Sequence, residues 1–249
     1  MKSNYNLDCD GLNRYIFSEK EKSALKIFDC RLMTLLEHTA IERPKRRELS
    51  FREVLNLAED FFMEQGVVYE SMRRLAKRLE AEGIAYAVIG GMAVTAHGHP
   101  RLTLDVDILL TPAGLKKFRE QLVGRGYVAT FPGATKTFID TESKVKIEII
   151  TAGEFPGDGL PKPVQFPDPT ETSIERDAVR FITLEKLIEL KLASGLTAPH
   201  RLRDLADVQD LIIALDLPLE LEEKLNASVR AEYRRLWEAA QIGRQQLER

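Results

Sequence analysis

The sequence has little of what secreted, zinc-binding and membrane proteins rely on. It contains two cysteines and four histidines among 249 residues. Cys9 and Cys30 are too few for a disulfide framework, and they lack metal-ligand spacing with the histidines. The N-terminus has no apolar core typical of a signal peptide, and no apolar run approaches the roughly 18 residues that a membrane helix needs. We therefore predict a soluble, cytoplasmic protein without membrane contact.

A dominant charge of one sign is also lacking. Lys and Arg together number 36 and Asp and Glu 39, which gives a net charge of −3. Binding of nucleic acid by bulk charge alone is therefore excluded, and any such contact has to be local. Hydrophobic residues make up 44% of the chain and charged residues 30%, which is the balance of an ordinary globular protein.

The first part of the chain has the pattern of helices. Serine–glutamate pairs with capping-box spacing start two apolar repeats, at Ser18 and at Ser50. A third repeat ends at Gly83, and glycine is typical of the position that follows a helix. We predict a helical N-terminal extension over residues 1–82.

The pattern changes to strands between residues 84 and 150. Residues 85–89 are an apolar run, and residues 104–110 alternate between apolar and polar positions. Residues 138–140 and 145–150 indicate a hairpin. Strands mixed with helices predict an α+β fold with a small mixed sheet, placed between the helical N-terminal extension and a helical C-terminal part.

Five of the eleven prolines lie between residues 156 and 169. Proline fixes its own φ angle and restricts the preceding residue, so this stretch predicts an extended connector. Helical repeats resume after Thr183. The predicted division is a helical N-terminal extension (1–82), a core (83–160), a proline-rich connector (161–180) and a helical C-terminal region that completes the site (181–249).

Two glycines, Gly90 and Gly91, end the first predicted strand directly before a short predicted helix. Glycine lets the backbone approach a ligand closely, and the start of a helix presents unpaired N–H groups to a phosphate. The alternative is a tight strand-to-helix turn that binds nothing.

Carboxylates follow on the strands. Asp105 and Asp107 share one face of a predicted strand with Cα atoms about 6.6 Å apart, and such a pair can converge on magnesium ions. The alternative is the solvent face of an edge strand. Glu148 has the matching position on a later predicted strand, and Asp140 competes with it for the role of third carboxylate.

Two charged residues of the C-terminal region lie within or beside the apolar stripes of predicted helices. Lys191 falls in the middle of its stripe, so it either extends to solvent at a shallow interface or points into a site for negative charge. Asp204 lies near another stripe, and its alternative role is to cap a helix N-terminus.

Taken in this order, the features resemble the nucleotidyltransferase superfamily, whose fold is related to that of DNA polymerase beta. The segment from Gly90 to Leu109 is similar to the bacterial branch that includes the nucleotidyltransferase toxins of abortive-infection systems. Residues 190–194 and 203–207 are similar to a second pair of motifs in these toxins. The resemblance covers about residues 84–215.

The resemblance implies transfer of a nucleoside monophosphate from a nucleoside triphosphate (NTP) to a hydroxyl, with release of pyrophosphate. It implies Mg²⁺ or Mn²⁺ as cofactor, an acceptor that is tRNA or protein, and the role of a toxin with an antitoxin protein as partner. The residues it implies are Asp105, Asp107 and Glu148 for metal, Gly90 and Gly91 for the triphosphate, Lys191 for phosphate and Asp204 to complete the site.

One departure from the family pattern bears on catalysis. Many members carry serine or threonine shortly after the glycines, where this chain has Met92 and Ala93. Thr95, one turn further on, is the candidate replacement for phosphate binding. The alternative function is therefore a catalytically impaired member of the fold that binds nucleotide or a partner protein.

Overall fold

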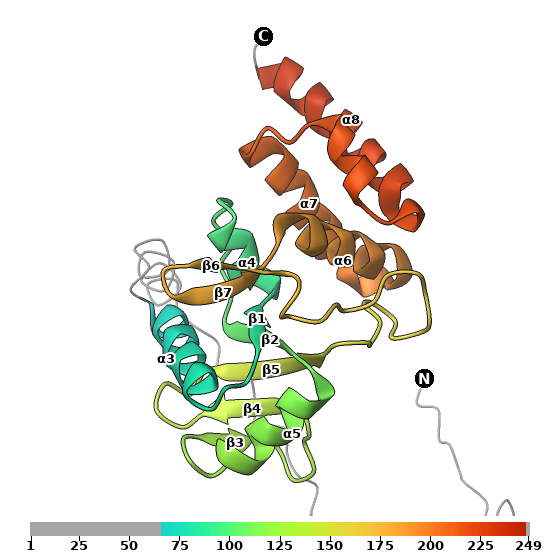
Figure 1. Ribbon diagram of the computed structural model, residues 1–249. Helices are drawn as coiled ribbons and strands as arrows, with labels where there is room; N and C mark the ends of the chain where they lie inside the picture. The colour runs from blue at the N-terminus through green and yellow to red at the C-terminus, as the bar shows by residue number, and fades with distance from the viewer. Residues whose placement is uncertain (1–65, 248–249) are drawn as a thin grey trace, which may run out of the picture. The chain divides into compact units, whose positions relative to one another are not determined.

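The computed structural model describes residues 66–247 (Figure 1). The helices predicted after Ser18 and Ser50 lie outside the described residues. Helix α3 (Val67–Ala81) is the third predicted helix, and it buries Met72, Leu75 and Leu79. Gly83 follows it with φ +59°, which confirms the predicted glycine at the helix end.

Seven strands form one mixed sheet in the order β3-β4-β5-β2-β1-β7-β6. At its centre β2 pairs with β1 in antiparallel and with β5 in parallel orientation. This confirms the predicted α+β class with a mixed sheet. The strands are β1 (Tyr86–Val88), β2 (Asp105–Leu110), β3 (Tyr127–Ala129), β4 (Thr137–Asp140), β5 (Lys146–Thr151), β6 (Ser173–Arg176) and β7 (Val179–Ile182).

The strand pair β6–β7 corrects the predicted connector at 161–180. Residues 152–172 contain neither helix nor strand, as the prolines predict, but the chain then forms a hairpin that joins the sheet beside β1. The hairpin turns at Asp177 and Ala178, both with positive φ, 50° and 59°. Turns of this kind favour Asn-Gly or Asp-Gly, and the Asp-Ala pair hides the turn from sequence patterns. The domain boundaries stay a prediction.

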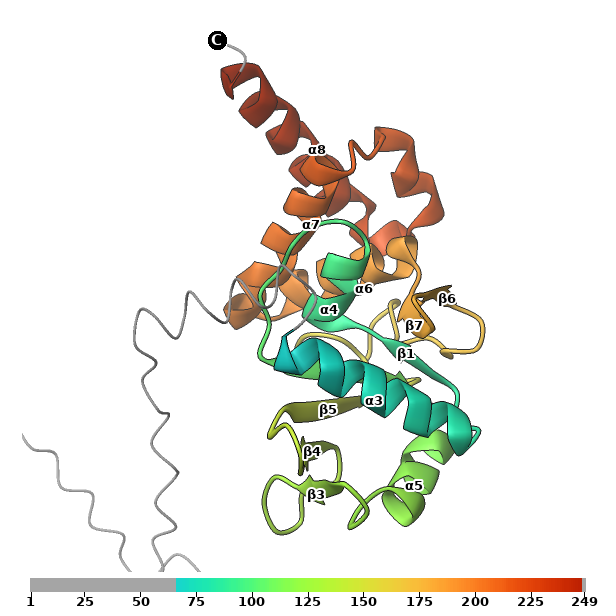
Figure 2. The same cartoon turned by 90° about the vertical axis from the view of Figure 1, so that its left-hand side faces the viewer.

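One face of the sheet is covered by α3 and α5 (Pro112–Gln121), and Figure 2 shows α3 lying across the strands. Phe118 of α5 contacts the ring of Phe138, while Ser71 of α3 donates a hydrogen bond to Asp140. The pairing register aligns Phe138 with Ile147. Val106 and Ile108 of β2 and Ile147 and Ile149 of β5 therefore face these two helices. The opposite face carries Asp105, Asp107 and Glu148 together with the buried Leu109.

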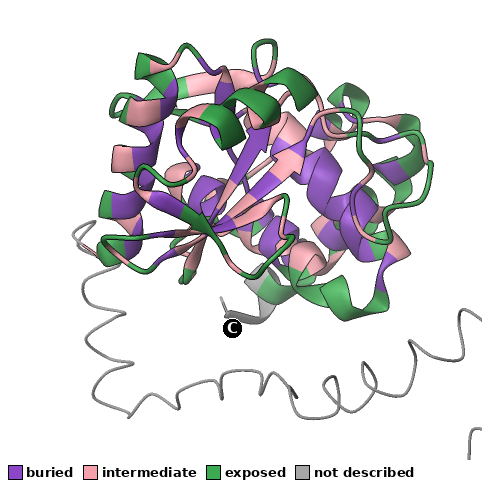
Figure 3. Ribbon diagram, turned by 90° about the horizontal axis from the view of Figure 1, so that it is seen from below, coloured by how far each residue is buried: buried purple, intermediate pink, exposed green. Residues whose placement is uncertain are grey.

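The remaining helices are α4 and those that follow β7. The short helix α4 (Gly90–Ala96) contacts β2, β7 and α6. The three α-helices that follow β7 pack against one another (Figure 1). Figure 3 shows the strands and inner helix faces largely buried and the outer helix faces exposed. Within residues 66–247 no helix is both long and apolar enough to cross a membrane. The C-terminal helices are α6 (Leu184–Thr197), η2 (Pro199–Arg201), α7 (Leu202–Ala214), η3 (Leu219–Lys224) and α8 (Ala227–Leu247).

Candidate active site

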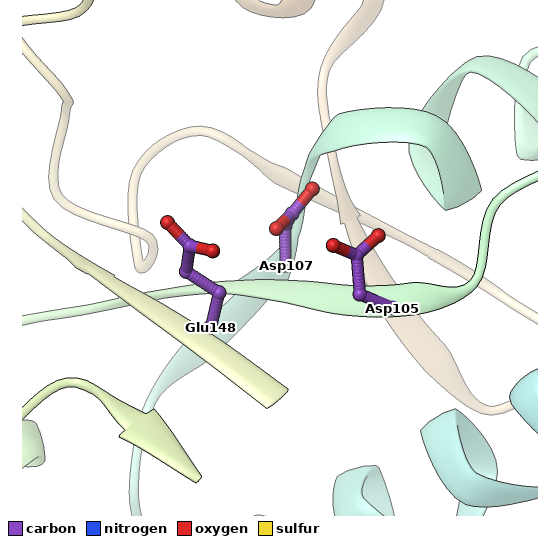
Figure 4. Close-up of side chains that lie close together, drawn as sticks. All are labelled: Asp105, Asp107 and Glu148. Atoms are coloured by element: carbon purple, nitrogen blue, oxygen red, sulfur yellow. The ribbon is translucent and has the colours of Figure 1, made fainter. Parts of the chain in front are cut away.

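Three carboxylates meet where β2 and β5 lie side by side. Asp107 is the register partner of Glu148, and Asp105 lies two residues earlier on the same face of β2. One carboxylate oxygen from each residue lies within 4.8 Å of the other two (Figure 4). All three side chains are half-buried. The structure thus brings together the three residues predicted for a metal site.

Asp140 lies on the opposite face of the sheet from Glu148, among the residues that face α3. Its carboxylate accepts hydrogen bonds from Ser71 and Ser143, at 2.8 Å each, and from Arg74 at 2.7 Å. Burial alone would raise its pKa, but these hydrogen bonds outweigh burial and lower the pKa to about 2. Asp140 therefore stabilises the packing of α3 and is not the third carboxylate of the cluster.

The electrostatics of the cluster favour a bound cation. Burial, and then the charges of Asp105 and Glu148, raise the pKa of Asp107 to about 7. Lys146 offsets part of this charge through an ion pair with Glu148, at 2.5 Å between Nζ and Oε2. Mg²⁺ and Mn²⁺ prefer oxygen ligands, so the donor set fits either ion.

The glycine turn packs directly against this cluster. Gly90 has φ +65°, a region that other residues rarely adopt, and a Cβ atom there would collide with Asp107 Oδ2. A Cβ atom at Gly91 would lie 2.9 Å from Thr103 Cβ. The turn is therefore tight, as the alternative interpretation has it, and Gly90 also lines the same cavity as the carboxylates.

Thr95 does not line the cavity that contains the carboxylates. Its hydroxyl donates to the Gly91 carbonyl at 3.3 Å and accepts from the Arg101 N–H at 3.2 Å. A different hydroxyl, which the sequence patterns did not single out, lies at the cluster: Thr103 Oγ1 donates to Asp105 Oδ1 at 2.8 Å. Thr103 thereby fixes the orientation of the Asp105 carboxylate.

Helices α6 and α7 supply part of the remaining cavity wall, and the other lining residues come from the residue directly after β1, from β5, from the segment 152–172 and from η2. The cavity is lined by the carboxylates and Gly90, by apolar side chains, and by polar side chains that include Lys191 and Asp204. The residues besides the carboxylates and Gly90 are Ile89, Ile150, Pro156, Phe166, Leu187, Leu190, Lys191, Ser194, Arg201 and Asp204. The three carboxylates and Gly90 therefore share one cavity with Lys191 and Asp204, whereas Gly91 and Thr95 are not part of its lining.

Lys191 is buried and points inward, since its Nζ lies 3.0 Å from Asp204 Oδ1 and 2.6 Å from Asp207 Oδ2. Asp204 also accepts hydrogen bonds from Ser194 and Arg201, at 2.7 and 3.0 Å. Burial would raise the pKa of Asp204, but the charge of Lys191 and these hydrogen bonds lower it. The two alternatives, Lys191 extending to solvent and Asp204 capping α7, are both wrong.

The sequence patterns missed four residues around Lys191: Asp207, Ser194, Arg201 and Arg101. A signal existed for two of them, because Asp207 is three residues after Asp204, and Ser194 three after Lys191. Positions three apart lie on the same helix face. Arg101 came from a loop, where no periodicity indicates its direction.

No protein-family model and no curated protein matches the chain. Its backbone is similar to several solved structures. A nucleotidyltransferase-like antigen from Paracoccidioides brasiliensis is 18% identical, with a TM-score of 0.38 over 57% of this chain and 74% of that one. ANT(2")-Ia bound to adenylyl-2"-tobramycin is 13% identical, with a TM-score of 0.44 over 68% and 96%. The c-di-GMP synthase CdnE from Capnocytophaga granulosa is 12% identical, with a TM-score of 0.30 over 86% and 91%. These TM-scores are all below 0.5, so we base the function on the chain's own residues.

Proposed function

We propose that this protein is a metal-dependent nucleotidyltransferase that moves a nucleoside monophosphate from an NTP to a hydroxyl. The observation that carries the proposal is the cluster of Asp105, Asp107 and Glu148 with Gly90 packed against it. Three carboxylates this close repel one another without a cation. The turn beside them places the backbone of Gly90 at the cavity, where it can contact a phosphate.

In the proposed reaction the acceptor oxygen forms a bond to the α-phosphorus of the NTP. The bond between that phosphorus and the bridging oxygen breaks, and pyrophosphate leaves with the electron pair. Asp105, Asp107 and Glu148 would hold one or two Mg²⁺ or Mn²⁺ ions, which stabilise the charge on the attacking and leaving oxygens. We assign to Glu148 the acceptance of the proton that the acceptor hydroxyl loses.

The rest of the cavity would hold the nucleotide. The backbone at Gly90 and Gly91 would contact the triphosphate, and the Lys191 ammonium would supply a positive charge to its oxygens. Leu187, Leu190 and the other apolar side chains of the lining offer a surface for a flat base. In this account the protein acts by positioning and by fixed charge, and no covalent intermediate forms on the chain.

The acceptor that we propose is tRNA or protein, in a toxin that an antitoxin protein controls. This part of the proposal is supported by the similarity of residues 190–194 and 203–207 to motifs of toxin nucleotidyltransferases. The alternative is a catalytically impaired member that binds nucleotide or a partner protein. That alternative is favoured by Met92 and Ala93 after the glycines and by the hydrogen bonds that direct the Thr95 hydroxyl elsewhere.

The test supplies each of the four α-labelled NTPs with Mg²⁺ to the full chain, mixed with RNA and protein fractions of a cell extract. We expect label in one of the two fractions. A bound metal stabilises the charge of the transition state by several kcal/mol. The double variant Asp105→Asn/Asp107→Asn should lose the metal, so the rate of transfer should fall by about 10³-fold or more. The control is Glu175→Gln, an exposed carboxylate on β6 outside the cluster.

The outcomes separate the two functions. Label that depends on the two aspartates and persists in the control supports the transferase and identifies its acceptor class. Metal-dependent binding of an NTP without pyrophosphate release supports the impaired alternative. If no NTP binds and no label moves, the transferase and the nucleotide-binding form of the alternative are both rejected.

A further inference from the structure

A buried carboxylate, Asp207, lies behind Lys191. Its Oδ2 accepts a hydrogen bond from Lys191 Nζ at 2.6 Å, and its Oδ1 accepts one from Arg101 Nε at 2.8 Å. The Asp207 side chain is 4% exposed and that of Lys191 is 8% exposed. Lys191 lines the cavity and Asp207 does not. Asp207 therefore does not contact a substrate in the cavity, and it contacts the cavity lining through Lys191.

Arg101 is itself fixed from several sides. Its Nη1 donates to the Leu102 carbonyl at 2.6 Å, and its backbone N–H donates to Thr95 Oγ1 at 3.2 Å. It belongs to the segment 97–104, which connects α4 to β2 and so links the glycine turn with the carboxylate strand. Contacts through Lys191, Asp207 and Arg101 therefore join α6 and α7 to the segment that leads into the carboxylates.

Lys191 needs such support because a lysine ammonium is a point charge on a flexible stem of four carbons. Its other carboxylate partner, Asp204, is shared with Ser194 and Arg201. Without the charge of Asp207, Lys191 would keep only this shared partner, and Arg101 would lose its carboxylate. The ammonium would then be free to move toward Asp204 or out of its present position.

We propose that Asp207 is a positioning residue that holds the Lys191 ammonium in place for the triphosphate and couples it to the segment 97–104 through Arg101. The inference rests on the proposed function, in which Lys191 meets the nucleotide. It assigns no contact with substrate to Asp207.

The structure provides a matched control on the next turn of α7. Asp210 lies 3.5 Å from His99 Nε2, so it also connects α7 to the segment 97–104. Its side chain is 47% exposed, and it does not line the cavity. Asp210→Asn shows whether loss of another contact between α7 and this segment, one without Lys191, changes nucleotide binding.

The test measures binding of the Mg²⁺ complexes of the α,β-methylene analogues of the four NTPs, using the analogue that wild type binds most tightly. A hydrogen bond between charged groups is stronger than one between neutral groups. We therefore expect Asp207→Asn to raise the Kd of the analogue about tenfold. Asp210→Asn should change it less than twofold. The double variant Lys191→Met/Asp207→Asn should bind no more weakly than Lys191→Met, because Asp207 acts through Lys191.

Mn²⁺ binding at the carboxylates and near-ultraviolet circular dichroism check that each variant is folded. If Asp207→Asn does not fold, Arg101→Gln replaces it, with an expected rise in Kd of about threefold. Equal Kd for Asp207→Asn and Asp210→Asn, an additive loss in the double variant, or an unchanged Kd for Arg101→Gln overturns the inference alone. Failure of wild type to bind any analogue overturns the proposed function and the inference with it.

Discussion

Within the carboxylate cluster, the pKa of Asp107 is raised. Burial is the largest cause and the charges of Asp105 and Glu148 add to it, so that the pKa of Asp107 reaches about 7. The sequence alternation places Asp105 and Asp107 on one face of β2, but it does not show which strand lies beside them. The pKa of Asp107 therefore depends on a contact between distant parts of the chain.

Metal binding should depend on pH through Asp107, because a metal ligand has to be deprotonated. With a pKa of about 7, the carboxylate is largely protonated at pH 6 and largely ionised at pH 8. We expect Mn²⁺ to bind about tenfold more tightly at pH 8 than at pH 6, measured by calorimetry at constant ionic strength. Asp107→Asn should lose this pH dependence. An affinity that is equal at pH 6 and pH 8 in wild type would contradict the role of Asp107 as a ligand.

The same shift has a consequence for stability. A carboxyl pKa raised from near 4 in the unfolded chain to about 7 in the folded protein means that the folded state binds the proton more tightly. The contribution of Asp107 to stability is therefore present at low pH and is lost as pH rises through about 7. A metal that neutralises the cluster should raise the thermal midpoint more at pH 8 than at pH 6.

At the scale of elements, the buried carboxylate of Asp140 connects α3 to the β4–β5 hairpin. Asp140 at the end of β4 accepts hydrogen bonds from Ser71 and Arg74 of α3 and from Ser143 in the hairpin turn. The contacts with Ser71 and Arg74 join residues 69 and 66 positions apart, so they fix α3 on its face of the sheet. The same hydrogen bonds lower the pKa of Asp140 to about 2, so the fold favours its ionised form.

Asp140→Asn should therefore lower the free energy of unfolding by about 2 kcal/mol at pH 7. A depressed carboxyl pKa stabilises the fold above the unfolded value near 4, and this contribution is lost as pH falls toward 2. The difference between wild type and variant should accordingly shrink from pH 4 downward in urea titrations. Glu142→Gln is the control, since Glu142 also pairs with Arg74 but its side chain is 72% exposed. A difference that stays constant down to pH 2 would show that Asp140 acts through shape and not through its charge.

The local parts of the fold could be predicted from the sequence. The run that ends at Gly90 and the alternation through Asp105 and Asp107 are patterns within a few residues, and each formed the expected element. The hairpin β6–β7 could not, because its turn is Asp177-Ala178 and carries no glycine. The choice between Asp140 and Glu148 depended on strand pairing, which brings β5 beside β2.

At the scale of the whole molecule, the candidate site requires both the sheet and the helices that follow it. The carboxylates come from β2 and β5, while Lys191 and Asp204 come from α6 and α7 (Figure 1). The sequence predicted these residues as separate features, and the resemblance to a family linked them. The ion pairs of Lys191 with Asp204 and Asp207 could not be predicted, because they depend on how α7 packs against α6.

Measuring pyrophosphate release tests most directly whether the three carboxylates support metal-dependent transfer. Initial rates would be followed for each NTP with Mg²⁺ and an acceptor-containing extract, in wild type, in Asp105→Asn, Asp107→Asn and Glu148→Gln singly, and in the control Glu175→Gln. We predict release with at least one NTP, its loss on chelation of the metal, and a fall of about 10³-fold in each cluster variant. The control should match wild type. Release that survives chelation, or that proceeds at the wild-type rate in the cluster variants, would contradict a metal-dependent transfer at these three carboxylates.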